Sequence, residues 1–148
     1  SNFPMYHGLK RLLSTGTVCR IKFKDALLRR DKTCRITKQI SDVCEAAHIV
    51  ELKDCWKHDK LGINSTGNGI LLRRDLHTLF DAHYWCINPR TLFRKDKDIY
   101  GHITAKIIFN KNISIKDTDL LKYKTIDIHV DSLFYWEKRY LEFFNRTK

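Results

Sequence analysis

The chain has 148 residues, of which 28 are Lys or Arg and 17 are Asp or Glu, so its formal net charge is +11 and its pI is near 9.6. With 43% hydrophobic and 11% aromatic residues, the composition excludes an intrinsically disordered chain and predicts one folded domain over residues 1–148. No hydrophobic run approaches the roughly 18 residues of a membrane span, and the basic excess indicates a partner with a phosphate backbone.

The N-terminal part is predicted to contain an arm and one helix. Residues 1–16 include Pro4 and Gly16 and are expected to form the arm. From Val18 to Arg30, hydrophobic residues recur at helical spacing among lysines and arginines, which predicts an amphipathic helix with a basic outer face. Because the first residue is Ser1 rather than Met, the chain is compatible with a processed product or a piece of a longer protein.

The five cysteines contain no CxxC pair. An odd number without close pairs predicts free thiols in a reducing, intracellular compartment. Cys34 and Cys44 are expected to be small buried core residues. The CxxH spacing of Cys55 and His58 leaves a structural zinc protein open as an alternative.

Residues 43–84 are predicted to form a strand, a loop, a second strand and a helix. Val43–Val50 is a short, mostly hydrophobic run before a polar stretch, which favours a strand. Residues 61–68 are rich in Gly, Asn, Ser and Thr and predict a loop. Gly69–Leu72 is a second short hydrophobic run, and Asp75 is a good N-cap for the helix that completes the unit.

Polar side chains of this unit fall where a catalytic site can form. His77 and Asp81 are four residues apart, so they share one face of the predicted helix and can hold one cation. One imidazole and one carboxylate, with water and phosphate in the other positions, suit Mg²⁺ or Mn²⁺, and Ni²⁺ or Zn²⁺ are also compatible. We expect His48 to face this pair and to take a proton from water, because imidazole titrates near neutral pH. Asn68 is expected to fix the His48 ring or the loop.

These motifs together are similar to those of a known family. The segments AHIV at residues 47–50, NGILL at residues 68–72 and DLHTLFD at residues 75–81 resemble the HNH endonuclease family, in particular its subgroup with AHI and LHxLFD motifs. The resemblance implies a ββα-metal (His-Me finger) core at residues 43–84 and one-metal cleavage of DNA phosphodiesters. It also implies roles for four residues: His48 as general base, Asn68 as the middle Asn, His77 as metal ligand, and Asp81 in place of a second metal-binding His of colicin-type nucleases.

Two positions depart from that family pattern. Many members place an Asp or His metal ligand directly before the general base, where this chain has Ala47, so the metal would rely on the two helical residues alone or recruit Glu45 or Asp75. Glu51 replaces a Pro that often follows the first motif, and it adds a negative charge near the expected phosphate path. An inactive DNA-binding module that has lost the ligand at position 47 is therefore an alternative function.

Beyond this core the pattern becomes extended and then helical again. Strands of a small antiparallel sheet are predicted at residues 84–87, at Thr91–Phe93 and at His102–Phe109. Residues 113–131 are predicted to be loop with short helical pieces. Residues 133–147 are predicted to form a helix that buries a hydrophobic stripe. The stripe consists of Leu133, Trp136, Tyr140, Leu141 and Phe144.

The prediction is therefore an α+β protein, with the ββα-metal core flanked by helices and a small antiparallel sheet, that cuts DNA with one divalent ion. Seven basic residues are expected to contact phosphates, which positions DNA without reading its sequence. They are Arg35, Lys38, Arg73, Arg74, Arg90, Arg94 and Lys95. A homodimer would be the simplest way for a one-metal unit to cut both strands, and membership of a larger multidomain protein is also compatible.

Overall fold

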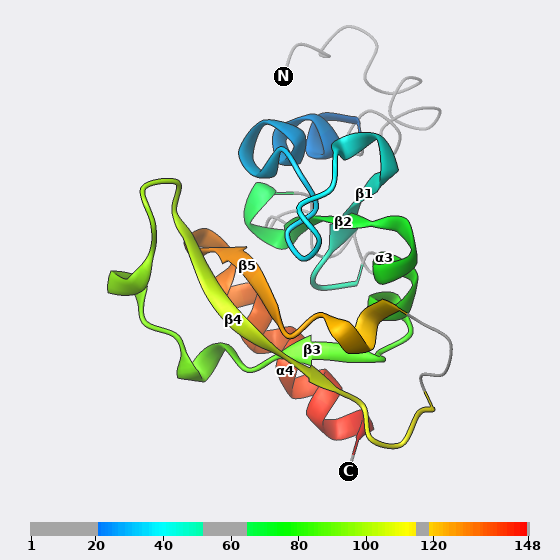
Figure 1. Cartoon of the computed structure of the whole chain (residues 1–148). Helices are drawn as coiled ribbons and strands as arrows, with labels where there is room; N and C mark the ends of the chain where they lie inside the picture. Colours follow the sequence, from blue (N-terminus) through cyan, green and yellow to red (C-terminus); the bar gives the residue numbers. More distant parts are fainter. Residues whose placement is uncertain (1–20, 52–64, 115–118, 148) are drawn as a thin grey trace, which may run out of the picture.

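The computed structural model describes residues 21–51, 65–114 and 119–147, where two small antiparallel sheets are combined with helices (Figure 1). The described chain opens within a helix over residues 21–31, in agreement with the predicted helix. The later elements are β1 (Cys44–His48), β2 (Gly69–Arg73), α3 (Arg74–Asp81), β3 (Trp85–Ile87), β4 (His102–Phe109), β5 (Thr125–His129) and α4 (Leu133–Arg146). This combination confirms the predicted α+β class.

The antiparallel strands β1 and β2 carry the central motifs. Their register places His48, the last residue of β1, opposite Gly69, the first residue of β2. A Cβ atom at Gly69 would collide with the Phe23 ring. The absent side chain thus lets the helix at residues 21–31 lie directly against this end of the strand pair. Both predicted strands are confirmed.

Helix α3 follows β2 without a connecting loop. Its N-cap is Arg73, which makes no side-chain cap hydrogen bond. The expectation that Asp75 caps the helix is therefore wrong. Asp75 lies in the first turn, where its carboxylate accepts hydrogen bonds from Arg73 Nε and Nη2 at 2.6 and 2.9 Å. The helix buries Leu76 and Phe80 on its inner face.

The second sheet has the order β3-β4-β5 and is antiparallel throughout. Strands β3 and β4 agree with the sequence prediction, but β5 falls in residues 113–131, which were expected to be loop. Ile126 and Ile128 are buried, while Thr125 is exposed and Asp127 and His129 are partly so. This alternation is typical of a strand with one buried face. The strand was not predicted because the alternating run is short and lies among charged residues.

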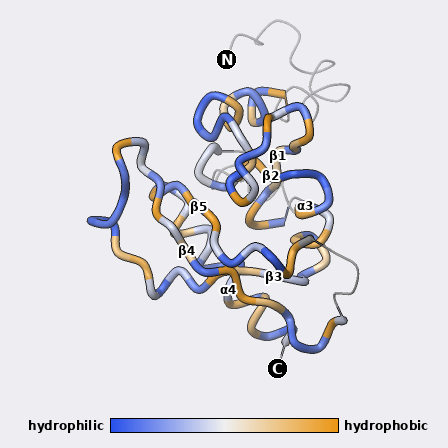
Figure 2. Tube along the Cα trace, viewed as in Figure 1, coloured by the Kyte–Doolittle hydropathy of each residue, from blue (hydrophilic) through white to orange (hydrophobic). Residues whose placement is uncertain are grey.

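A long connection, residues 88–101, joins β3 to β4 and projects away from the rest of the molecule (Figure 1). The strand predicted at Thr91–Phe93 does not form, because Pro89 opens a 3₁₀ turn over Pro89–Thr91 and the Asn88 side chain accepts a hydrogen bond from Arg90 N at 3.0 Å. Hydrophilic and hydrophobic residues alternate irregularly along the connection (Figure 2).

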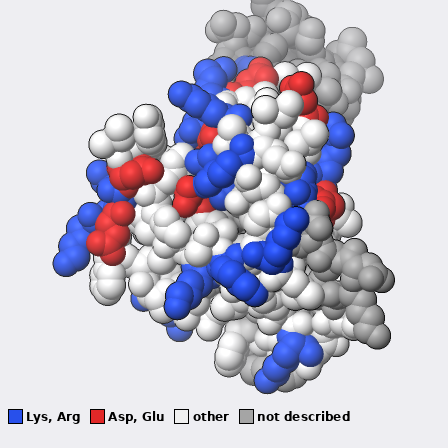
Figure 3. Space-filling view, in the orientation of Figure 1, with Lys and Arg blue, Asp and Glu red and all other residues white. Residues whose placement is uncertain are grey.

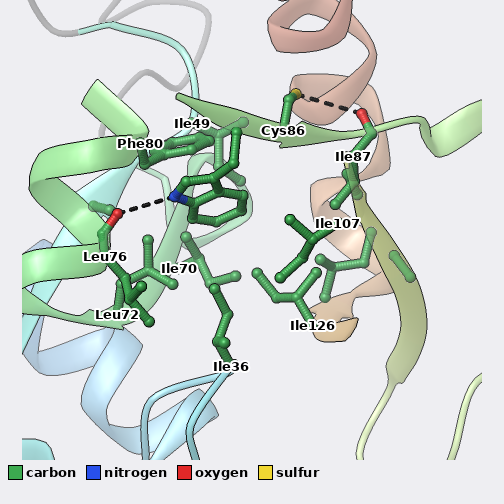
Figure 4. Packing of buried hydrophobic residues seen from close by; sticks show 14 of the residues in the cluster. Ile36, Ile49, Ile70, Leu72, Leu76, Phe80, Cys86, Ile87, Ile107 and Ile126 are labelled. Atoms are coloured by element: carbon green, nitrogen blue, oxygen red, sulfur yellow. Dashed lines mark hydrogen bonds between the residues drawn. The ribbon is translucent and has the colours of Figure 1, made fainter. Parts of the chain in front are cut away.

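Helix α4 packs against β3 and contributes Trp136 to the centre of the molecule. The rings of Phe80 and Trp136 lie 5.4 Å apart, and Trp85 completes the group at 4.8 Å from Phe80. The Trp85 indole also donates a hydrogen bond of 3.1 Å to the Leu76 carbonyl oxygen, which ties β3 to α3 (Figure 4). The same hydrophobic cluster includes Ile70 of β2, Ile107 of β4 and Ile126 of β5.

The buried face of α4 differs from the predicted stripe. Phe143 is buried, whereas Leu141 and Phe144 are 46% and 51% exposed. At 100° per residue, position 143 lies about 20° from Trp136 around the helix and position 144 about 80° away. Phe143 therefore shares the buried face of the helix with Trp136, and Phe144 does not. Arg139 is also buried, with its guanidinium 4.0 Å from the centre of the Phe80 ring.

Asp31 joins the helix at residues 21–31 to both sheets. Its buried carboxylate accepts hydrogen bonds from Leu71 N of β2 at 3.0 Å and from Arg30 Nε at 2.8 Å, and it lies 3.2 Å from His102 Nε2 of β4. Arg30 in turn donates to the carbonyl oxygen of Gly69 at 2.8 Å. The helix therefore holds the strand pair by directed polar contacts as well as by packing.

Several sequence predictions fall outside the described residues, namely the arm at residues 1–16, residues 61–64 of the predicted loop, and Cys55 with His58. Within the described residues, Cys34 and Cys44 are buried and free, as expected, and so is Cys86. None of the helices in that part of the chain has the length and apolar character needed to cross a membrane.

Candidate functional site

His77 lies between two carboxylates at the junction of α3 and β1. Its Nδ1 atom is 2.8 Å from Glu45 Oε1 on β1, and its Nε2 atom is 3.1 Å from Asp81 Oδ2, one turn further along α3. The His77 side chain is 19% exposed, whereas Asp81 is 59% exposed. The Glu45 side chain is 44% exposed, so both ring nitrogens of His77 face accessible carboxylates.

The two carboxylates also set the protonation of His77. Burial on its own lowers the pKa of His77, but the hydrogen bonds to Asp81 and Glu45 and their negative charges outweigh burial and raise the pKa above its ordinary value. Because a metal ligand must be an unprotonated nitrogen, protons compete with any cation at this ring, and the competition weakens as the pH rises.

His48 is on the other face of the strand pair. Side chains alternate along a strand, so Glu45 and His48, three residues apart in β1, point to opposite faces. Glu45 meets α3 through His77, while the His48 ring stacks on Phe23, with ring centres 4.2 Å apart and planes inclined by 7°. The expectation that His48 faces the helical pair directly is therefore wrong. Ala47 shares the α3 face with Glu45 and is fully buried.

Asn68 is fully buried and fixes the chain just beyond His48. Its side-chain oxygen accepts a hydrogen bond of 2.8 Å from Val50 N, and its amide nitrogen donates one of 3.2 Å to Val50 O. Ile49 N also donates to the Asn68 carbonyl oxygen at 3.1 Å. Of the two roles considered for Asn68, these contacts correspond to the one in which it holds the backbone at the end of β1.

The comparison with known families supports the motif analysis. Residues 34–88, which include β1, β2 and α3, match the family model described as HNH endonuclease. This segment is thus similar to the HNH endonuclease family. No curated protein matches the chain. The match supports a nuclease-type hydrolase, while the AHI and LHxLFD subgroup stays a prediction.

The basic residues expected to contact DNA differ in how freely their side chains extend. Within the HNH segment, Arg74 is 64% exposed and lies 3.8 Å from Glu45. Arg73 is 14% exposed, and its guanidinium binds Asp75 and also Gln39 at 2.9 Å. Arg74 is thus the more accessible of the two.

The other predicted phosphate contacts lie around the HNH segment and on the β3–β4 connection. Lys38 pairs with Asp127 of β5, and Arg35 donates to the Thr33 hydroxyl at 2.6 Å. Arg90 is 3.6 Å from Glu137. Both Arg94 and Lys95 are exposed on the connection. Lys and Arg side chains are spread over much of the face shown in Figure 3, among smaller groups of Asp and Glu.

A second group of polar side chains beside the HNH core was not predicted. His83 Nε2 lies 3.2 Å from Glu51 Oε1 and 3.8 Å from Glu142 Oε1, and ligand atoms of all three residues lie within 4.8 Å of one another. The structure therefore shows a His and Glu cluster that could hold a metal ion. Consecutive members are 32 and 59 residues apart in sequence, so local spacing does not predict the cluster. The only signal in the sequence was Glu51, at a position where the family often has Pro.

Proposed function

We propose that the protein is a metal-dependent endonuclease that hydrolyses DNA phosphodiester bonds, with a divalent ion at His77 and Asp81. The observation that carries the proposal is the hydrogen-bonded row of Glu45, His77 and Asp81 within the HNH segment. Histidines that bind metals usually donate their second ring N–H to a carboxylate, which fixes the tautomer and the ring orientation. Glu45 is placed for that role, which leaves His77 Nε2 and the Asp81 carboxylate for the ion.

This arrangement refines the ligand set considered from the sequence. Glu45 lies on the ring nitrogen opposite Asp81, so it orients His77 rather than sharing an ion at Nε2. Asp75 is engaged by Arg73. One imidazole nitrogen and one exposed carboxylate leave several positions for water and phosphate, which suits Mg²⁺ or Mn²⁺, and Ni²⁺ and Zn²⁺ are also compatible with the imidazole.

We assign proton transfer to His48. Its imidazole stacks flat against Phe23, and a neutral imidazole can accept a proton from an attacking water. Asn68 keeps the backbone beyond His48 in place through Val50, and Arg74 is accessible to a phosphate oxygen. When bound, a divalent ion supplies stabilisation of the charge that develops on the phosphate and the leaving oxygen.

The placement of His48 on the face opposite Glu45 supports this assignment. In the family pattern a metal ligand often stands directly before the general base, and adjacent residues of a strand point to opposite faces. In that pattern the side chains of the ligand and the base thus leave the strand on opposite sides, and both must still reach the same phosphate at the end of β1. Position 47 is occupied by Ala47, but Glu45 on the same face supplies a contact to His77.

The experiment is cleavage of supercoiled plasmid in EDTA, Mg²⁺, Mn²⁺, Ni²⁺ and Zn²⁺ by the wild type and two variants of His48. His48→Ala removes the ring, whereas His48→Phe keeps a ring against Phe23 but cannot accept a proton. We expect metal-dependent nicking or linearisation by the wild type, and a loss of at least about 100-fold in rate for both variants, with DNA binding retained.

Cleavage by His48→Phe at the wild-type rate would reject His48 as the base. Failure of the wild type to cut with any metal, together with salt-dependent DNA binding, would favour the alternative of an inactive DNA-binding module. Ala47 would then be the lost ligand that explains the inactivity.

A further inference from the structure

The Glu51–His83–Glu142 cluster joins three separate parts of the fold. Glu51 follows the end of β1, His83 follows the C-terminal end of α3, and Glu142 is on α4. His83 is nearly fully buried, while the Glu51 and Glu142 side chains are 29% and 39% exposed. The cluster is therefore a partly accessible link between the HNH core and the C-terminal helix.

The spacing of the ligand atoms fits a bound cation. Zinc binds imidazole nitrogen and carboxylate oxygen at about 2.0–2.2 Å, so tetrahedral geometry separates two ligand atoms by roughly 3.4 Å. The distances from His83 Nε2 to Glu51 and Glu142, 3.2 and 3.8 Å, lie on either side of that value. One ion at the centre of the three atoms requires only small side-chain movements.

The charges of the cluster also favour a cation. The Glu51 and Glu142 carboxylates both approach His83 Nε2, and a divalent ion would balance their two negative charges.

Neighbouring cations compensate these charges only in part. Arg146 Nη2 lies 3.1 Å from Glu142 Oε1, the same oxygen that lies 3.8 Å from His83 Nε2. The buried guanidinium of Arg139 acts at longer range, because its hydrogen bond goes to the Phe80 carbonyl oxygen.

His83 is held in place by its backbone. It has a positive φ of 60°, which is uncommon for a residue other than Gly or Asn. Its carbonyl oxygen accepts a hydrogen bond of 3.1 Å from the buried Asn110 side chain, and Tyr84 O accepts one of 2.8 Å from Asn110 N. The buried Nδ1 atom has no hydrogen-bond partner among the described residues. The polar contacts of the His83 ring are therefore those of Nε2 with the Glu51 and Glu142 carboxylates.

We propose that Glu51, His83 and Glu142 bind one divalent cation, with Zn²⁺ as the best match to one nitrogen and two carboxylate ligands, and that this ion fastens α4 to the HNH core. It is separate from the ion proposed at His77, and the inference does not depend on DNA cleavage.

The test uses the full chain with His77→Ala, which removes the proposed catalytic ligand, so that bound zinc reports on the second site. Zinc content after equilibration with micromolar Zn²⁺ and removal of free metal is measured by mass spectrometry, and thermal unfolding is followed with Zn²⁺ and with EDTA. We expect one zinc per chain and a rise in melting temperature of about 5–10 °C, as for a ligand at about 100 times its dissociation constant.

Adding Glu142→Gln or His83→Asn should abolish the stoichiometric zinc and most of the melting-temperature shift. Asn tolerates a positive φ, so His83→Asn tests the site without straining the backbone, and it decides the outcome if Glu142→Gln does not fold. Glu137→Gln, an exposed position on the same helix, is the matched control and should behave like the parent. Absence of zinc from the parent, or equal zinc in His83→Asn, would overturn the proposal.

Discussion

At the residue scale, Glu45 and Asp81 contact different nitrogens of His77 and should therefore affect metal binding differently. Glu45→Ala leaves His77 Nδ1 without its acceptor, so the ring and its tautomer are no longer fixed. We expect the apparent affinity for Mg²⁺ or Mn²⁺ to fall by about 10–100-fold, as for other groups that hydrogen-bond a metal-binding histidine. The measurement is the dependence of plasmid cleavage on metal concentration, with the rate at saturating metal falling less than the affinity.

This measurement is best made near pH 8. Glu45 is one of the groups that raise the pKa of His77, so its removal also weakens competition from protons, and a high pH keeps that effect small. Asp42→Ala is the matched control, because Asp42 is exposed just before β1. Equal metal dependence for Glu45→Ala and the wild type would contradict the role given to Glu45.

At the element scale, the helix at residues 21–31 is held against both sheets through Asp31. Burial alone raises the pKa of Asp31, but hydrogen bonds from His102, Arg30 and Leu71 N, with the charge of Arg30, outweigh it and lower the pKa from 3.8 to about 2. We expect Asp31→Asn to lower the free energy of unfolding at pH 7 by about 3–5 kcal/mol, because it leaves a buried polar network without its charge. Urea denaturation provides the measurement.

The lowered pKa also predicts how stability depends on pH. The folded protein holds Asp31 ionised more strongly than the unfolded chain does, so this contribution is complete above about pH 4 and is lost as the pH falls through 2. It amounts to about 2 kcal/mol. The Asp31→Asn protein should therefore show a shallower decline in stability between pH 4 and pH 2. Asp25→Asn, exposed on the same helix, should change stability by less than about 0.5 kcal/mol.

The elements that the sequence predicted well are those with a local signal. Gly69 and the hydrophobic runs beside it mark β1 and β2, and the spacing of His77 and Asp81 places both residues on one face of α3. Contacts between distant parts of the chain were missed, because nothing local encodes them. Glu45 approaches His77 only through the β1–α3 packing, and His83 meets its carboxylates only once α4 has docked. The direction of His48 depends on Phe23, which lies 25 residues earlier and supplies the stacking surface.

At the scale of the whole molecule, the net charge is +11, and on the face shown in Figure 3 the Lys and Arg side chains are spread out rather than gathered in one patch. Many basic residues are already paired, as Lys38 is with Asp127 and Arg146 is with Glu142. The β3–β4 connection differs because it projects outward and carries exposed Arg94 and Lys95 beside the exposed Phe93 ring. We therefore expect this connection to contribute phosphate contacts out of proportion to its length.

Salt dependence separates such contacts from a general effect of charge. Each neutralised phosphate changes the slope of the logarithm of the binding constant against the logarithm of salt concentration by about 0.9 for duplex DNA. Replacing Arg94 and Lys95 together with Ala should make the slope shallower by roughly 1.8. The control with Lys122 and Lys124 replaced by Ala removes the same charge from exposed positions near β5, where we expect little change. Binding is measured in EDTA with a short duplex, so that cleavage does not interfere. An equal change of slope in both double variants would show that net charge, rather than the connection, determines DNA affinity.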